Sequence, residues 1–189
     1  MSLATLKEVL SIASEKKIAI PAFSVDNLEV AEEIAAAAEE HSLPAILMIG
    51  QYTIKYGKLE DVANIIKNLA LSCRVPLVLH LDHGSSYEQA VLCLRNGFTS
   101  VMFDGSKLPL EQNVSITREI VRAARAVGVS VEAELGAIGG TEDGQTAKAN
   151  LVDVDEARTF LEQVEVDALA IGIGNAHGIY KSTPNLAFD

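Results

Sequence analysis

The feature that most constrains the fold is a repeated alternation of short, nearly continuously apolar segments with longer segments of helical periodicity. The apolar segments lie at 18–23, 45–49, 76–82, 100–103, 130–135 and 168–173. Such continuous apolarity is typical of strands that are covered on both faces. The helical patterns lie at 2–15, 28–40, 58–71, 88–95, 110–126 and 156–164. Strands separated by helices in this way predict βαβ units and a parallel α/β sheet.

Two architectures fit this order of elements, an open doubly wound sheet and a (β/α)8 TIM barrel. Polar residues follow four of the predicted strands, in the segments 80–84, 104–106, 132–136 and 174–178. Active sites of both architectures lie at the carboxyl ends of the strands, and contributions from four strands favour a barrel. A barrel usually needs about 250 residues. We therefore expect residues 1–189 to be a single barrel domain with about the first six βα units, lacking the last two.

Composition excludes several classes of partner. The chain has 26 acidic and 15 basic residues, for a net charge of −11, which argues against binding of nucleic acid or of an anionic membrane surface. No apolar stretch reaches the roughly 18 residues that a membrane helix needs. Cys73 and Cys93 lack the spacing of a redox or zinc motif, and the N-terminus lacks the apolar core of a signal peptide. The sequence predicts a cytoplasmic protein.

The segment HLDHG at 80–84 carries the clearest chemical signal. Strand alternation puts His80 and Asp82 on one face, while His83 lies where the strand turns into its loop. An imidazole at this rim suits a zinc ion, and Asp82 beside it suits a general acid/base. A structural role, with His80 packed in the core and the other two residues capping the next helix, is an equal alternative.

Two carboxylates, Glu132 and Glu134, share one face of a strand that is otherwise apolar. Buried carboxylates are costly unless they are paired or bind a metal. The other strands have few basic residues, so a metal or catalytic role is favoured over a structural salt bridge. Asp104, which follows the preceding strand, is placed to share a cation with Glu134.

Two glycine-rich segments follow the last two predicted strands. The segment 139–144, continued by residues 145–149, predicts a long flexible loop that could close as a lid and carry Glu142 inward. The segment 172–178 offers backbone N–H groups to a phosphate, with His177 placed for the same metal as His83. Lys181 could neutralise that phosphate. On composition alone, a solvated turn is the alternative for the first segment.

Taken as an ordered set, these motifs resemble the class II, zinc-dependent ketose-bisphosphate aldolases. The matching segments are HLDHG at 80–84, SVMFDGS at 100–106, SVEAELGAIGGTEDG at 130–144 and GNAHGIYK at 174–181. Their order, strand placement and spacing all agree with this family, which includes fructose-1,6-bisphosphate and tagatose-1,6-bisphosphate aldolases. The resemblance implies a (β/α)8 barrel.

The resemblance also implies a catalytic Zn²⁺ held by three histidines. His83 and His177 match two of these ligands, and the third is expected beyond residue 189. Asp104 and Glu134 match carboxylates that hold the metal in an alternative position or hold a second divalent ion.

Other roles follow from the resemblance alone. Asp82 matches the residue that exchanges a proton with the substrate's C4 hydroxyl, and Glu142 matches a loop acid that transfers a proton at the dihydroxyacetone-phosphate carbon. Gly178 and Lys181 match groups that contact the phosphate and a neighbouring monovalent cation.

The implied function is cleavage of a ketose 1,6-bisphosphate to dihydroxyacetone phosphate and glyceraldehyde 3-phosphate through a zinc-stabilised enediolate. The phosphorylated sugar is the expected partner, and a homo-oligomer, dimer or tetramer, is the expected assembly. Which ketose is cleaved is left open. Two alternatives also stay open: an inactive truncated remnant that acts only through association with a partner, and a Schiff-base aldolase that uses Lys107 or Lys181.

Overall fold

The computed structural model describes residues 3–142, 145–147, 151–180 and 182–188, with the backbone alone for 141–142 and 145–147. Among these residues, a curled parallel sheet of six strands holds the molecule together, in the order β1-β2-β3-β4-β5-β8. The strands are β1 (Ala22–Ser24), β2 (Ala45–Ile49), β3 (Leu77–Gly84), β4 (Ser100–Phe103), β5 (Ser130–Leu135) and β8 (Ala168–Ile171). Consecutive order with parallel pairing throughout corresponds to the first six βα units of a TIM barrel.

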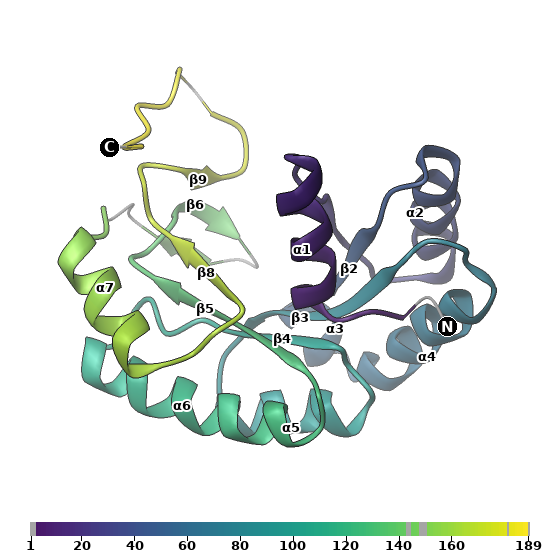
Figure 1. Ribbon diagram of the computed structural model, residues 1–189, viewed down its shortest axis with the longest axis horizontal. Helices are drawn as coiled ribbons and strands as arrows, with labels where there is room; N and C mark the ends of the chain where they lie inside the picture. The colour runs from purple at the N-terminus through teal and green to yellow at the C-terminus, as the bar shows by residue number, and fades with distance from the viewer. Residues whose placement is uncertain (1–2, 143–144, 148–150, 181, 189) are drawn as a thin grey trace.

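The helices cover the convex side of this sheet, with one exception (Figure 1). They are α1 (Leu6–Lys16), α2 (Leu28–His41), α3 (Gln51–Lys55), α4 (Leu59–Ser72), α5 (Tyr87–Arg95), α6 (Leu110–Ala126) and α7 (Val154–Gln163). The exception is α1, which lies on the concave side. Asn27, Ser86 and Asp153 are the N-caps of α2, α5 and α7, and the side chain of each accepts at least one backbone N–H. No helix in the described part of the chain is long and apolar enough to cross a membrane.

The core consists of two layers because strand side chains alternate between the faces of the sheet. Leu47, Leu79 and Val101 are fully buried in the outer layer, which the strands share with helices α2, α4 and α5. In the inner layer, Ile46 and Val78 pack in a separate cluster with the apolar face of α1. Both faces of the central strands are therefore covered, which explains their continuous apolarity in the sequence.

The first strand differs from the prediction of 18–23. It begins only at Ala22 because Pro21 has no N–H for the ladder; its carbonyl instead accepts from Ile46 N at 3.0 Å. All three residues of β1 are exposed, and Phe23 retains 44% of its accessible surface. In the described sheet β1 pairs only with β2, so burial on both faces was a wrong expectation for this edge strand.

A second, three-stranded sheet lies above the carboxyl ends of the main strands. It comprises β6 (Gly139–Glu142), β7 (Gln145–Ala147) and β9 (Ala176–His177). The predicted flexible loop was wrong for residues 139–142 and 145–147, which form an antiparallel hairpin. Gly140, at φ 101°, pairs with His177, and a Cβ at this glycine would come within 2.3 Å of the His177 carbonyl oxygen. The two glycine-rich segments are thus joined by backbone pairing.

Candidate functional site

The end of β3 contains a β-bulge that reorients His83. Leu81 pairs with Val101 and Gly84 pairs with Phe103, so β3 has one residue more than β4 in this interval. His83 adopts a left-handed conformation, with φ 46°. Simple alternation would put Asp82 and His83 on opposite faces of the strand. Because of the bulge, both polar side chains can face the concave side of the sheet.

Gly84 makes the bulge sterically feasible. A Cβ at this position would lie 2.2 Å from the Met102 carbonyl oxygen on the neighbouring strand. The Gly84 carbonyl also accepts from Asp104 N at 2.9 Å, which joins the end of β3 to the residue after β4. The glycine of the HLDHG motif is therefore required by close backbone approach rather than by chemistry at the site.

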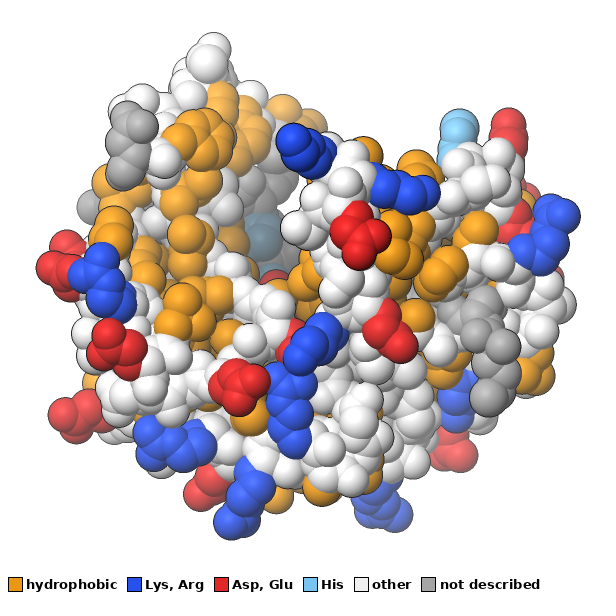
Figure 2. Space-filling model, viewed as in Figure 1, with side chains coloured by type: hydrophobic (Ala, Val, Ile, Leu, Met, Phe, Trp, Pro, Cys, Tyr) orange, Lys and Arg blue, Asp and Glu red, His pale blue; other side chains and the backbone are white. Residues whose placement is uncertain are grey.

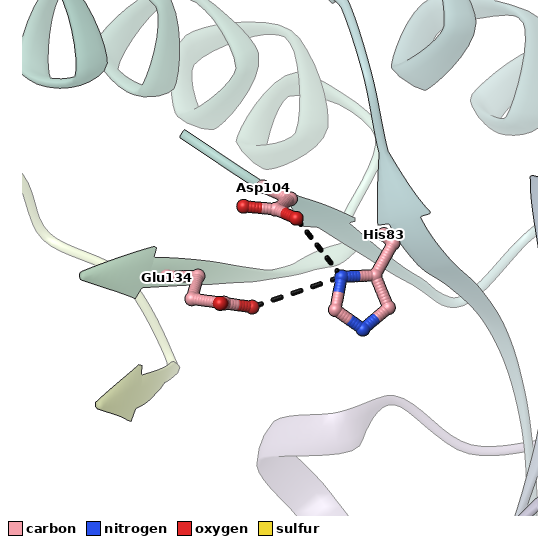
Figure 3. Close-up of side chains that lie close together, drawn as sticks. All are labelled: His83, Asp104 and Glu134. Carbon is pink, nitrogen blue, oxygen red and sulfur yellow. Dashed lines mark hydrogen bonds and ion pairs between the residues drawn. The ribbon is translucent and has the colours of Figure 1, made fainter. Parts of the chain in front are cut away.

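His83, Asp104 and Glu134 form one group at the carboxyl end of the sheet (Figure 3). His83 Nδ1 lies 3.0 Å from Asp104 Oδ2 and 3.7 Å from Glu134 Oε2. One ligand atom from each side chain falls within 4.8 Å of the others. The His177 ring stands edge-on to the His83 ring, with centroids 5.5 Å apart. All four residues predicted from the sequence to face a metal are thus brought together.

The donor set of this group fits a divalent cation. Glu134 is 2% exposed, and its Oε2 is buried without a hydrogen-bond partner among the described residues. A buried carboxylate oxygen in this state is costly unless a cation or proton occupies the position that it faces. Imidazole nitrogens and carboxylate oxygens are both among the ligands that zinc takes in proteins. Figure 2 shows a hollow in the molecular surface between α1 and the segment that carries β6 and β9.

The pKa values of the two carboxyl groups in this cluster are shifted in opposite directions. Burial raises the pKa of Asp104, but hydrogen bonds from His83 and Ser106 outweigh it and lower that pKa to about 2. Burial and the charge of Asp104 raise the pKa of Glu134 to about 7. Without a metal, Asp104 is therefore the anionic partner of His83 and Glu134 is partly protonated near neutral pH.

Asp82 of β3 and Glu132 of β5 belong to a second polar group. Burial, together with the nearby charge of Asp82, raises the pKa of Glu132 to about 7. Glu132 Oε2 lies 3.6 Å from His80 Nε2, and His80 Nδ1 lies 2.8 Å from the buried Ser100 hydroxyl. Burial, with the nearby charge of His83, lowers the pKa of His80 to about 3, so His80 is neutral and does not form an ion pair with Glu132.

Of the other three predicted site residues, the structure describes Gly178 and the backbone of Glu142. Gly178 directly follows β9 and has φ 84°, a conformation that glycine adopts without strain. The backbone of Glu142 ends β6, but the predicted inward position of its side chain falls outside the described residues. Lys181 also lies outside the described residues.

Asn113, a 1% exposed residue of α6, lies beside the site but was not predicted from the sequence. Its Nδ2 donates to the Glu134 carbonyl at 2.9 Å, and its Oδ1 accepts from the Thr117 hydroxyl at 3.0 Å. A Cβ on Gly105 would lie 2.2 Å from the Asn113 Oδ1, so the glycine after Asp104 makes room for this amide. Asn113 thus contacts the backbone beside both metal-facing carboxylates. The sequence does contain a signal for this residue, because Asn113 places a polar amide on the largely apolar face of the helix predicted at 110–126.

The raised carboxyl pKa values predict how the metal-free protein responds to pH. The protonated carboxyl groups of Glu132 and Glu134 contribute to the free energy of unfolding. This contribution is fully present below the unfolded pKa of 4.5 and is lost as pH rises through about 7. His80 works in the opposite direction, since its pKa of about 3 reduces stability as pH falls below 6.5. The combined effect of the two glutamates is larger than the opposite effect of His80. The free energy of unfolding should therefore fall by about 3 kcal/mol between pH 5 and pH 8.

Urea unfolding in the presence of a chelator measures this dependence. The double variant Glu132→Gln with Glu134→Gln is the matched control, because it keeps the shape of both side chains and removes both titrations. In that variant only the effect of His80 remains, so the free energy of unfolding should rise as pH increases from 5 to about 6.5. A parent protein whose stability is flat or increases from pH 5 to pH 8 would contradict the burial of these two carboxyl groups.

Comparison with known proteins places this geometry in a family. The family model described as "Fructose-bisphosphate aldolase class-II" matches residues 4–189. The chain is 42% identical to a fructose-bisphosphate aldolase of Geobacillus stearothermophilus over 100% of its own length and 67% of the relative's length. It is 37% identical to a 6-phospho-5-dehydro-2-deoxy-D-gluconate aldolase of Halalkalibacterium halodurans, with the same shares covered.

A solved structure agrees with these sequence relatives. The YdjI aldolase from Escherichia coli K12 superposes with a TM-score of 0.86 and 34% identity, over 98% of this chain and 66% of that one. The chain thus spans about two thirds of the length of the relatives that it matches. The sequence matches and the structural match agree, and the chain belongs to the class II fructose-bisphosphate aldolase family.

Proposed function

We propose that this protein is a zinc-dependent aldolase that cleaves, and in reverse forms, a ketose 1,6-bisphosphate, with dihydroxyacetone phosphate and glyceraldehyde 3-phosphate as the two halves. One observation carries this proposal: His83, Asp104 and Glu134 present ligand atoms within 4.8 Å of one another at the carboxyl end of the sheet. The family relationship supports the reaction class.

The proposed metal site consists of His83 and His177, with Asp104 and Glu134 available for an alternative position or a second ion. A divalent cation bound there supplies Lewis acidity at the ketone oxygen of the substrate. The hydrogen bond between Asp104 and His83 Nδ1 orients the imidazole, as carboxylates commonly do for metal-binding histidines. Asn113 fixes the backbone carbonyl of Glu134 and thereby the position of its carboxylate.

Proton transfer at the substrate's C4 hydroxyl is assigned to Asp82. In cleavage Asp82 takes the hydroxyl proton as the carbon–carbon bond breaks, and in condensation it returns that proton. Glu132, whose pKa is raised to about 7, lies close enough to respond to the charge of Asp82. Glu132 is therefore suited to hold a proton beside Asp82 near neutral pH.

The remaining assignments follow the family resemblance. Glu142 is proposed to transfer the proton at the dihydroxyacetone-phosphate carbon. Gly178 and Lys181 are proposed to contact the phosphate and a neighbouring monovalent cation. The pairing of Gly140 with His177 supports the proposal that both glycine-rich segments act together, since it links the backbone of one to the metal-facing histidine of the other.

The identity of the sugar is a separate question. The relatives include proteins named for a fructose bisphosphate and for 6-phospho-5-dehydro-2-deoxy-D-gluconate. We propose a ketose bisphosphate because the higher identity, 42% against 37%, is to the former. Cleavage rates measured with fructose 1,6-bisphosphate, tagatose 1,6-bisphosphate and the deoxygluconate compound distinguish these substrates.

The decisive experiment measures zinc content and aldol cleavage of the same preparation, before and after chelation and with borohydride present. We expect bound zinc, loss of cleavage on chelation, recovery with added zinc, and no borohydride adduct. Chelator-resistant cleavage with an adduct at Lys107 or Lys181 would support the Schiff-base alternative. Protein that binds neither zinc nor substrate would support the inactive remnant.

Three further expectations stay predictions. They are a single barrel domain over residues 1–189, a homo-oligomeric assembly as dimer or tetramer, and a cytoplasmic location. Sedimentation of the purified protein at several concentrations measures the assembly directly.

A further inference from the structure

Two glutamine side chains meet beside the bulge that carries His83. Gln51 is the first residue of α3 and Gln89 lies in the first turn of α5. Gln51 Nε2 donates to Gln89 Oε1 at 3.1 Å, and Gln89 Nε2 donates back to Gln51 Oε1 at 2.9 Å. This reciprocal amide pair is partly buried, and it joins two helices that follow different strands.

The amide pair is bonded to the backbone on both sides of Gly84. Gln51 Nε2 donates to the His83 carbonyl at 2.7 Å, and the Ser85 N–H donates to Gln89 Oε1 at 2.7 Å. Gln51 also lies 3.4 Å from the Asp82 carbonyl. The two side chains therefore bind the backbone of residues 82–85, the segment that contains the bulge.

His83 needs such support more than an ordinary strand residue does. A histidine at φ 46° is in the left-handed region, which costs conformational free energy for a residue with a Cβ. Relaxation to ordinary strand geometry would restore simple alternation and turn the ring away from Asp104 and Glu134. A short hydrogen bond to the carbonyl of this same residue opposes that relaxation.

We propose that Gln51 and Gln89 are positioning residues for His83, and that their amide pair preserves metal affinity by holding the bulge in the conformation that aims the imidazole at Asp104 and Glu134. The proposal rests on the proposed function, since it takes the group around His83 to be a metal site. Neither glutamine needs to touch the metal or the substrate. The contribution is indirect, like that of other outer-shell partners of metal ligands.

The test compares metal affinity among four variants of the protein. Gln51→Leu and Gln89→Leu remove the amide groups at similar volume. Gln51→Glu keeps the side-chain length but replaces the N–H that donates to His83 with an oxygen. The matched control is Gln163→Leu, because the Gln163 amide also donates to a backbone carbonyl, that of Thr159, far from the site at the end of α7.

Affinity for Co²⁺ is measured by titration against a competing chelator, and the visible spectrum of bound Co²⁺ reports the ligand geometry. We expect roughly 10- to 100-fold weaker binding in Gln51→Leu and Gln51→Glu, an altered spectrum, and a similar direction of change in Gln89→Leu. Gln163→Leu should bind as the parent does. Urea unfolding of the metal-free variants shows that each is folded.

The possible results separate this inference from the proposed function. If the parent binds Co²⁺ and the Gln51 and Gln89 variants bind it with unchanged affinity and spectrum, only the positioning role is overturned. A loss of metal-free stability without a loss of affinity also overturns it, because that result marks a merely structural tie between α3 and α5. If the parent binds no metal, both proposals fail together.

Discussion

Replacing Asp82 with alanine is expected to lower aldol turnover by roughly 10²- to 10⁴-fold while the metal stays bound, the effect of losing a general acid/base. Asp82 is partly buried in β3 and acts electrostatically on Glu132 of β5. The metal-facing group of His83, Asp104 and Glu134 does not include it. The Asp82→Ala variant should therefore lose turnover and keep its bound metal.

Turnover and zinc content measured on the same preparation test this expectation. Asp82→Asn is the closer replacement, because it keeps the shape of the side chain and removes only its basicity. Asp155→Ala is the matched control, since Asp155 is an exposed aspartate of α7 whose ion pair with Arg158 lies on the surface. Unchanged turnover in Asp82→Ala would remove Asp82 from the proposed reaction. Loss of zinc together with turnover would instead assign Asp82 to the metal site.

Replacing His83 with alanine should abolish stoichiometric metal binding and aldol turnover together. His83 Nδ1 is the atom that lies between Asp104 and Glu134, so its removal leaves two carboxylates without their shared nitrogen partner. Alanine also relieves the charge-assisted hydrogen bond that lowers the pKa of Asp104 to about 2. The carboxyl pKa of Asp104 should accordingly rise in the metal-free variant.

Zinc analysis after dialysis and a chelator-controlled activity assay test this second expectation. His41→Ala is the matched control, because His41 is an exposed histidine in the last turn of α2 and faces no candidate ligand in the described structure. It should keep both zinc and turnover. Retained stoichiometric zinc in His83→Ala would refute the assignment of His83 as a ligand.

Sequence periodicity alone located most of the fold. The predicted strands at 45–49, 100–103 and 130–135 coincide with β2, β4 and β5. Each of these strands is paired on both sides, and most of their residues are buried. The two-residue period also placed Glu132 and Glu134 on one face, and the structure has them on the concave side with His80 and His83 respectively.

Prediction failed where local pattern and long-range pairing differ. Residues 139–142 and 145–147 have the composition of a loop, yet pairing with each other and with β9 makes them strands. The segment that contains β1 is apolar like the central strands, but β1 lies at the edge of the described sheet, pairs there only with β2, and is exposed. The five-residue helix α3 is too short to produce a periodic signal.

For the site, the sequence by itself determined which chemical groups follow which strands, and hence that His83, Asp104, Glu134 and His177 share one end of the sheet. This much depends only on chain order and strand period, which are local properties. The bulge at His83, the separation of Asp82 from the metal-facing group, and the amide contacts of Gln51, Gln89 and Asn113 were decided by tertiary structure alone. Each depends on the register between distant segments, and register is set by the packing of the whole sheet.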